Sequence, residues 1–220
     1  MHHEVRIYES VDELAKASAA YVASQIRDLS DRSGAFTFAL SGGRSPWLML
    51  AELAREKVAW NRTVIYQVDE RVVPEDDDLR NLKHLREALA ATDAPIEAMD
   101  VENPELEEAT KSYATKLPPR FDLIHLGLGP DGHCASLVPN DPVLEVTDRL
   151  VALSGPYQDT IRMTLTYPAL ERADQLLWLV SGEDKQDALA RLLDGDTSIP
   201  AGRVEAGASL VMADRAALPT

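Results

Sequence analysis

The sequence predicts an α/β protein with a mostly parallel sheet and helices on both faces of that sheet. Short apolar runs of strand length alternate along the chain with longer stretches of helix length. This alternation is typical of βαβ units, whose crossover helices cover both faces of a parallel sheet. No internal repeat, low-complexity segment or linker interrupts the pattern, so we expect residues 1–220 to form a single domain.

Capping signals and apolar runs predict the elements of the first half of the chain. Ser10 and Glu13 have the spacing of a capping box, and Pro46 after Ser45 predicts a helix with Ser45 as its N-cap. The expected elements are a helix from Ser10 to about Leu29, a strand over Ala35–Leu40, a helix from Ser45 to about Glu56, a strand over Val64–Val68, a helix from about Asn81 to Ala90, a loop from Thr92 to Val101 and an acidic helix after Asn103–Pro104.

The second half of the chain continues the alternation. The expected elements are a central strand over Phe121–Leu126, shorter strands near Leu150 and Arg162, a fully buried strand over Leu176–Val180, a helix from Ser181 to Leu193 that Gly195 ends, and a last strand over Ser209–Met212.

Composition excludes several classes of partner. The chain has 22 Lys and Arg residues against 37 Asp and Glu residues, a net charge of −15. We therefore expect neither a nucleic acid nor an anionic membrane as partner, because phosphate groups bind basic surfaces. No apolar run approaches the length of a membrane span and no secretory signal is evident, so we expect a cytoplasmic location. The single cysteine excludes an internal disulfide.

The most informative segment follows the central strand. Gly127, Gly129 and Gly132 fall within six residues and predict a tight turn, and His133 comes directly after it. Open α/β sheets carry their chemistry at the carboxyl ends of their strands. A titratable ring at such a place makes His133 a candidate catalytic residue.

A second strand also ends in a glycine pair, within Ser41–Pro46. Free N–H groups at a helix start favour an anion, most simply a phosphate, and the Arg44 guanidinium adds a bidentate donor. An ordinary capped turn between a strand and a helix explains this segment alone about equally well. The third segment, Asp69–Pro74, places charged groups after the strand over Val64–Val68. For Glu70 the favoured interpretation is a solvated loop with a local ion pair.

Together these segments resemble the 6-phosphogluconolactonase family. Leu40–Pro46, Asp69–Pro74 and Gly127–Pro139 are similar, in this order, to three motifs of the family. Arg162–Thr166 is similar to a fourth, and Lys185 falls on the lysine that begins the following helix. The resemblance implies a Rossmann-like three-layer sandwich that hydrolyses 6-phospho-D-glucono-1,5-lactone to 6-phospho-D-gluconate without a cofactor.

The chain departs from the family's motifs at a few positions. Arg44 stands where serine is frequent, Arg80 replaces the serine of a Ser-Asn pair, and Cys134 replaces a threonine or another small residue. Pro200–Gly202 replaces a more usual Pro-Ala-Ser. None of these changes removes His133.

Lactone hydrolysis needs an activated water, a stabilised carbonyl oxygen and a proton for the leaving ring oxygen. His133 is the candidate for both proton transfers. Asp131 either orients the ring or, more simply, shapes the turn, and Asp69 positions the water or the histidine. The backbone of Gly127–Gly132, including Gly129 and Gly132, is a candidate source of N–H donors to the oxyanion.

The phosphate of the substrate requires cations, and the motif segments contain them. The expected phosphate contacts are Ser41, Gly42, Gly43 and Arg44 with Arg71 and Lys185, and Arg162 is a further candidate. No cluster has metal-ligand spacing, so we expect no metal ion. The expected partner is the sugar-phosphate lactone alone, bound by a monomer or a small homo-oligomer.

The sequence leaves another nucleophile and other functions open. Cys134 is a candidate for a thioester route, although a buried structural thiol is favoured, and His125 within the central strand is expected to be packed. Glucosamine-6-phosphate deaminases share the fold and a similar histidine turn, but that turn continues into a glutamate where this chain has Leu137 and Val138. A non-catalytic sugar-phosphate sensor is a third hypothesis. Such a sensor is expected to lose the histidine that this chain has as His133.

Overall fold

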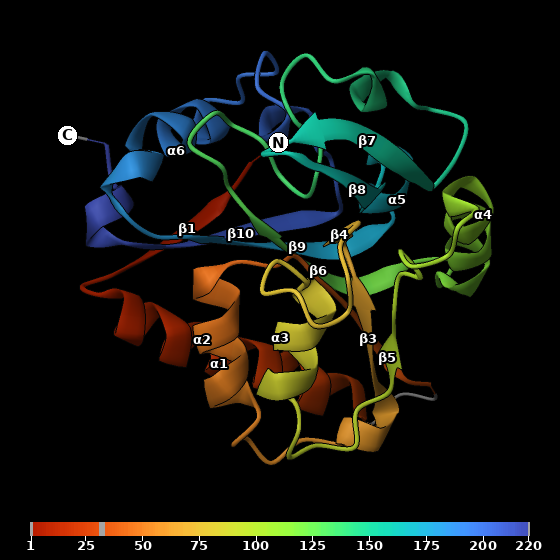
Figure 1. The fold of residues 1–220 in the computed structure, drawn as a ribbon. Coiled ribbons are helices and arrows are strands. Elements are labelled where there is room, and N and C mark those ends of the chain that lie inside the picture. The colour runs from red at the N-terminus through yellow and green to blue at the C-terminus, as the bar shows by residue number, and fades with distance from the viewer. Residues whose placement is uncertain (1, 31–33, 220) are drawn as a thin grey trace.

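The sheet of this protein is the parallel one that the sequence predicts. A computed structural model describes residues 2–30 and 34–219 (Figure 1). Its main sheet has seven strands in the order β1-β10-β9-β6-β2-β3-β5, and every neighbouring pair is parallel. The strands are β1 (Glu4–Tyr8), β2 (Phe36–Leu40), β3 (Thr63–Gln67), β5 (Ile96–Glu97), β6 (Phe121–Gly127), β9 (Ala173–Val180) and β10 (Ala208–Asp214).

Helices cover both faces of this sheet, which confirms the three-layer sandwich. Figure 1 shows α1, α2 and α3 on one face and α4, α6 and a smaller sheet on the other. The helices are α1 (Val11–Ser30), α2 (Arg44–Leu53), α3 (Asn81–Ala88), α4 (Leu106–Lys116), α5 (Tyr167–Leu170) and α6 (Gln186–Leu193). Among the described residues, none of the helices is long and apolar enough to cross a membrane.

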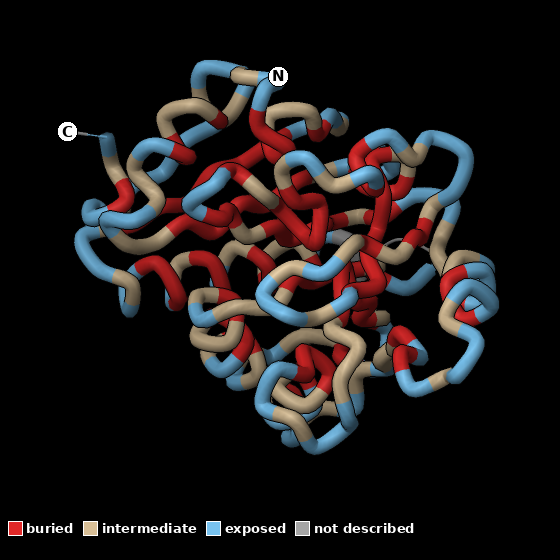
Figure 2. Tube along the Cα trace, turned by 45° about the horizontal axis from the view of Figure 1, so that its top comes forward, coloured by how far each residue is buried: buried red, intermediate tan, exposed pale blue. Residues whose placement is uncertain are grey.

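The strands are apolar on both faces, because each face has its own hydrophobic core. In β9, Leu177 and Leu179 pack with α1 and α2, whereas Trp178 and Val180 point to the opposite core. This alternation follows from the two-residue period of a strand. Buried residues accordingly fill the middle of the molecule and exposed ones lie on its outer turns (Figure 2).

A second, antiparallel sheet was not expected. It has the order β4-β8-β7, with β4 at Asp69–Arg71, β7 at Val151–Tyr157 and β8 at Thr160–Leu165. The predicted strands near Leu150 and Arg162 are therefore present, but they belong to this sheet. The segment that begins with Asp69 forms a strand rather than a solvated loop, and Glu70 is fully buried, so the solvated reading of Glu70 is wrong.

The start of α2 also differs from the prediction. The helix begins at Arg44 with Gly43 as its N-cap and has no side-chain cap. Ser45 lies inside the first turn, where its Oγ is hydrogen-bonded to Ser181 Oγ at 2.6 Å. Pro46, which lacks an N–H, occupies the third helical position, where an N–H would have no helical partner.

Two strands of the main sheet escaped the sequence analysis. β1 is an exposed edge strand of five residues that pairs only with β10. β5 has only two residues, within the stretch expected as a loop. Short edge strands depend on pairing with a neighbour rather than on their own periodicity.

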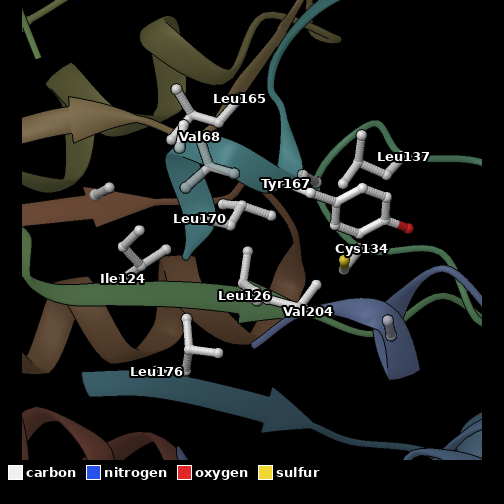
Figure 3. Packing of buried hydrophobic residues seen from close by; sticks show 14 of the residues in the cluster. Val68, Ile124, Leu126, Cys134, Leu137, Leu165, Tyr167, Leu170, Leu176 and Val204 are labelled. Atoms are coloured by element: carbon white, nitrogen blue, oxygen red, sulfur yellow. The ribbon is translucent and has the colours of Figure 1, made fainter. Parts of the chain in front are cut away.

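The end of the histidine turn is anchored in the core. Figure 3 shows Cys134 and Leu137 among Leu126, Tyr167 and Val204, and both Cys134 and Leu137 are almost completely buried. Cys134 and Leu137 also form an isolated antiparallel bridge. Close packing of this kind resists displacement, so the turn is held on one side by the core.

His125, in the middle of β6, is packed as the sequence predicts. It is fully buried, and neither ring nitrogen has a hydrogen-bond partner among the described residues. Burial lowers its pKa to about 3, because the charged ring loses its hydration. An unfolded chain binds this proton below about pH 6.5, so the unfolded state gains protons that the folded state rejects.

We therefore predict that the free energy of unfolding decreases as the pH is lowered from about 6.5 to about 3. The substitution His125→Leu is expected to remove part of this decrease. The slope lost is up to about 1.4 kcal/mol per pH unit, the value for one proton. Urea unfolding from pH 7 to pH 4 measures it, and His2→Gln, at an exposed position, is the control. An unchanged slope in His125→Leu contradicts the prediction.

Candidate active site

A cleft of about 560 Å³ opens at the carboxyl ends of the central strands β2, β6 and β9. Its volume lies within the ordinary range for small-molecule sites. The predicted site residues that line it are Ser41, Gly42, Gly43, Arg44, Asp69, Arg71, Gly129, His133, Arg162 and Lys185. Asp131 and Gly132 are not in the lining, but both shape the turn that holds His133.

The turn after β6 pairs its histidine with an aspartate. His133 Nδ1 lies 2.5 Å from Asp131 Oδ1, and the same oxygen accepts the His133 backbone N–H at 3.2 Å. Asp131 therefore orients the ring as well as shaping the turn. Partial burial opposes ionisation of Asp131, but the neighbouring His133 outweighs it and lowers the pKa of the carboxyl. With Nδ1 on the carboxylate, Nε2 is the ring nitrogen left for a ligand.

Glycine is required at two positions of this turn. A Cβ on Gly129 would lie 2.0 Å from His133 Nδ1, so any side chain there displaces the ring. Gly132 has a φ of +83°, and a Cβ on it would lie 2.6 Å from Ile199 Cβ. The Gly129 and Gly132 N–H groups donate to His133 O and Gly129 O within the turn. These two N–H groups are therefore engaged within the turn, and their role toward an oxyanion stays a prediction.

The loop between β2 and α2 has the features of an anion site. Ser41 Oγ is buried without a hydrogen-bond partner among the described residues. Gly42 packs so closely that a Cβ would lie 1.9 Å from Asn81 Oδ1. Arg44 is exposed at the helix start and forms no ion pair with any described residue. A helix N-terminus with an arginine beside it favours an anion.

Glu70 connects this loop with β4 and α3. Its carboxylate accepts hydrogen bonds of 2.7–2.8 Å from Gln67 Nε2, Arg71 N, Asn81 N and Leu82 N, and Arg80 Nε lies 3.7 Å away. The carboxylate thus caps the start of α3 and holds Asn81 in place. Asn81 Nδ2 then donates to Asp69 O at 2.9 Å, and Asn81 Oδ1 accepts from Arg71 Nη1 at 2.6 Å.

Two arginines face the cleft side by side. Arg71 and Arg162 are direct partners in the β4–β8 ladder, and neither forms an ion pair within the described chain. The Nε atoms of both are buried without hydrogen-bond partners. Burial, and then the neighbouring Arg71, lower the pKa of Arg162. The nearby Asp69 opposes this shift without forming an ion pair, and two adjacent arginines without a described ion-pair partner favour a bound anion.

Lys185 is a weaker candidate than these arginines. Its Nζ forms an ion pair of 2.9 Å with Asp184, which lines the same cleft. Asp69 lies deeper in the cleft, where its Oδ2 accepts from Ser136 Oγ at 2.8 Å. Asp69 is thereby fixed, with only 4% of its surface exposed.

Cys134 is not placed for nucleophilic chemistry. It is 1% exposed and does not line the cleft. Burial, with a further contribution from Asp69, raises the pKa of its thiol far above the ordinary value. Within the described parts of the chain, no group of three or more His, Cys, Asp or Glu residues is arranged to hold a metal ion.

The sequence analysis did not assign two side chains that lie in the cleft. Asn81, which follows Arg80 and is the asparagine of the Ser-Asn pair, lies between Gly42 and Arg71. Tyr157 was not considered, and it lies beside both His133 and Arg162. Its place just before a sharp hairpin turn gives no signal in sequence that it reaches the site.

Comparison with known proteins places the chain in a family. Residues 9–212 match the family described as glucosamine-6-phosphate isomerases/6-phosphogluconolactonase. A 6-phosphogluconolactonase of Streptomyces coelicolor is 33% identical, over 92% of this chain and 85% of the relative. The structure of the 6-phosphogluconolactonase from Thermotoga maritima superposes with a TM-score of 0.88 at 29% identity, over 97% of this chain and 100% of that one.

The chain belongs to the glucosamine-6-phosphate isomerase/6-phosphogluconolactonase family. The fold alone does not separate the two activities in the family's description. A monomeric glucosamine-6-phosphate deaminase superposes with a TM-score of 0.86 at 18% identity, over 97% of this chain and 98% of that one. The choice between the activities therefore depends on the residues of the cleft.

We predict that Glu70→Gln destabilises the protein by about 3 kcal/mol, because it leaves buried donors and the buried Arg80 without a carboxylate. Urea unfolding at pH 7 measures the change. The control is Glu75→Gln, which breaks only the exposed pair with Arg86 and is expected to cost less than about 1 kcal/mol. Equal effects of the two substitutions would show that the Glu70 network contributes no more than a surface pair.

Proposed function

We propose that this protein hydrolyses 6-phospho-D-glucono-1,5-lactone to 6-phospho-D-gluconate, the second step of the oxidative pentose phosphate pathway. The observation that carries the proposal is the combination of one Asp131–His133 pair with two unpaired arginines in a single cleft. Family membership and the names of the similar proteins support the same activity.

In the proposed mechanism, His133 Nε2 accepts a proton from water while the water oxygen attacks the lactone carbonyl carbon. The His133 imidazole then returns this proton to the ring oxygen of the lactone as the C–O bond between the carbonyl carbon and that oxygen breaks. Asp131 holds the ring through Nδ1 and stabilises its charged form between the two transfers. Asp69, held by Ser136, is the candidate to orient the water.

The phosphate binds apart from the reacting carbon in this proposal. Arg71 and Arg162 supply the main positive charge, and the Ser41–Arg44 loop supplies N–H groups and the Ser41 hydroxyl. Lys185 contributes once its pair with Asp184 is released or shared. Such an anchor fixes the distance between the lactone carbonyl and His133.

The residues of the cleft give less support to glucosamine-6-phosphate deaminase activity. The position of the additional acid in the deaminase turn corresponds to Leu137 and Val138, which are both buried. The carboxylates that line the cleft are Asp69, Asp184 and Asp214, and no described glutamate does so.

The direct test is a rate assay of the purified protein on two substrates. We expect lactone opening well above the spontaneous rate, no ammonia from glucosamine 6-phosphate, and no loss of activity after EDTA treatment. Ammonia release at a catalytic rate would overturn the assignment. Activity that EDTA removes and a divalent metal restores would overturn the metal-independent mechanism.

We predict that His133→Ala lowers kcat by roughly 10²-fold or more, the usual scale for a lost general base. Cys134→Ala is the matched control from the next position, and it is expected to keep near wild-type kcat because the buried thiol does not reach the cleft. Near wild-type turnover in His133→Ala removes this residue from the mechanism, and an inactive, folded Cys134→Ala supports the thioester route.

A further prediction concerns the phosphate. Glucono-δ-lactone, which lacks phosphate, is expected to be a much poorer substrate than its 6-phosphate. Arg71→Gln is expected to shrink that preference roughly tenfold, the effect of losing one charge-assisted contact. The control is Arg55→Gln, which breaks an exposed pair with Glu52 on the surface. An unchanged preference in Arg71→Gln places the phosphate elsewhere.

A further inference from the structure

The tip of the β7–β8 hairpin brings an unassigned tyrosine into the cleft. Gln158 and Asp159 at the tip have φ values of 51° and 63°, the left-handed conformation that a tight two-residue turn requires. The ladder between β7 and β8 also shifts register between Ser154 and Tyr157. Such an irregularity re-aims the side chains that follow it, and Tyr157 and Gln158 both line the cleft.

Tyr157 contacts the proton-transfer end of the site. Its hydroxyl donates to Asp131 Oδ2 at 3.3 Å, while the other oxygen of this carboxylate holds His133. Its ring also lies edge to face with the His133 ring, with centroids 5.3 Å apart and an interplanar angle of 64°. Both oxygens of Asp131 are therefore engaged, one by the catalytic ring and one by Tyr157.

The same ring contacts the anion-binding end. The Arg162 guanidinium carbon lies 5.0 Å from the Tyr157 ring centroid, within the range of a cation–π contact. Arg162 Nη2 also donates to Gln158 Oε1 at 3.2 Å. The hairpin tip is thus the local support of an arginine that forms no ion pair in the described chain. No other described aromatic ring contacts both His133 and Arg162.

The Tyr157 hydroxyl keeps its proton at neutral pH. Partial burial, and then the charge and hydrogen bond of Asp131, raise its pKa above the ordinary value of a tyrosine. Its hydroxyl accordingly remains a donor to Asp131. A donor to a carboxylate disperses the negative charge and so weakens the hold of that carboxylate on the charged histidine.

We propose that Tyr157 is a positioning residue that couples the two ends of the site. Its hydroxyl sets the basicity of His133 through Asp131, and its ring holds Arg162 toward the phosphate of the substrate. The proposal rests on the proposed lactonase function for its kinetic consequences only, since both contacts have consequences in the protein without substrate.

The test separates the hydroxyl from the ring with two variants. Tyr157→Phe removes the donor to Asp131 and retains the ring, whereas Tyr157→Leu removes both. Tyr21→Phe is the matched control, because Arg6 lies over the Tyr21 ring at 5.5 Å far from the cleft. Circular dichroism of each variant confirms that it is folded.

For Tyr157→Phe, we expect the acid limb of the kcat/KM profile to move to higher pH by about half a unit, with little change in KM. The NMR titration midpoint of the His133 ring, identified by its loss in His133→Gln, is expected to move equally without any substrate. If neither the acid limb nor the His133 midpoint moves in Tyr157→Phe, the proposed role of the hydroxyl is wrong.

For Tyr157→Leu, we expect binding of inorganic phosphate, measured by calorimetry, to weaken roughly threefold or more, while Tyr157→Phe binds it as the wild type does. Equal phosphate affinity in Tyr157→Leu and the wild type overturns the role of the ring. A wild-type protein that fails to open the lactone refutes the proposed function, but the titration and the calorimetry still decide the role of Tyr157.

Discussion

The buried carboxylate of Glu70 is the interaction on which the arrangement of the cleft depends. It is the meeting point of β4, the start of α3 and, through Asn81, the Gly42 loop. A charge buried in this way is tolerated only because donors surround it. Those donors are the Gln67 side chain and the backbone of Arg71 and of α3, so their geometry is fixed together. Asp69 and Arg71 are the neighbours of Glu70 in β4, so the hydrogen bonds of Glu70 also fix their positions.

Charge distribution explains how a strongly acidic chain presents a site for an anion. The net charge is −15, yet Arg71 and Arg162 face each other in the cleft, with Asp69 near Arg162 but no ion pair to either arginine among the described residues. Holding two like charges together costs stability, and the surrounding network offsets that cost. In the proposed mechanism, the phosphate of the substrate relieves this repulsion when it binds. Three acidic side chains, Asp69, Asp184 and Asp214, line the cleft together with four cationic ones, so the acidic excess lies elsewhere in the described chain.

Much of the fold followed from the sequence, because parallel buried strands and the turns after them have strong local signals. The turn that ends in His133 and the loop that begins with Ser41 fall in the cleft for this reason. The prediction for Glu70 is wrong because two of its four donors are backbone groups of α3, more than ten residues away, and a local pattern does not show them. Ser45 was misplaced as an N-cap because Ser181, far along the chain, takes its hydroxyl. Tyr157 was missed because a register shift in a hairpin, which no local pattern encodes, aims it at the site.

In the proposed function, one cleft holds the phosphate at its arginines and the reacting carbonyl at His133. A crystal structure with bound 6-phosphogluconate measures this directly. We expect the phosphate within hydrogen-bond distance of the Arg71 or Arg162 guanidinium, and the carboxylate of the product beside His133 Nε2. A product bound with its phosphate at His133, or with its carboxylate outside hydrogen-bond reach of that ring, would contradict it.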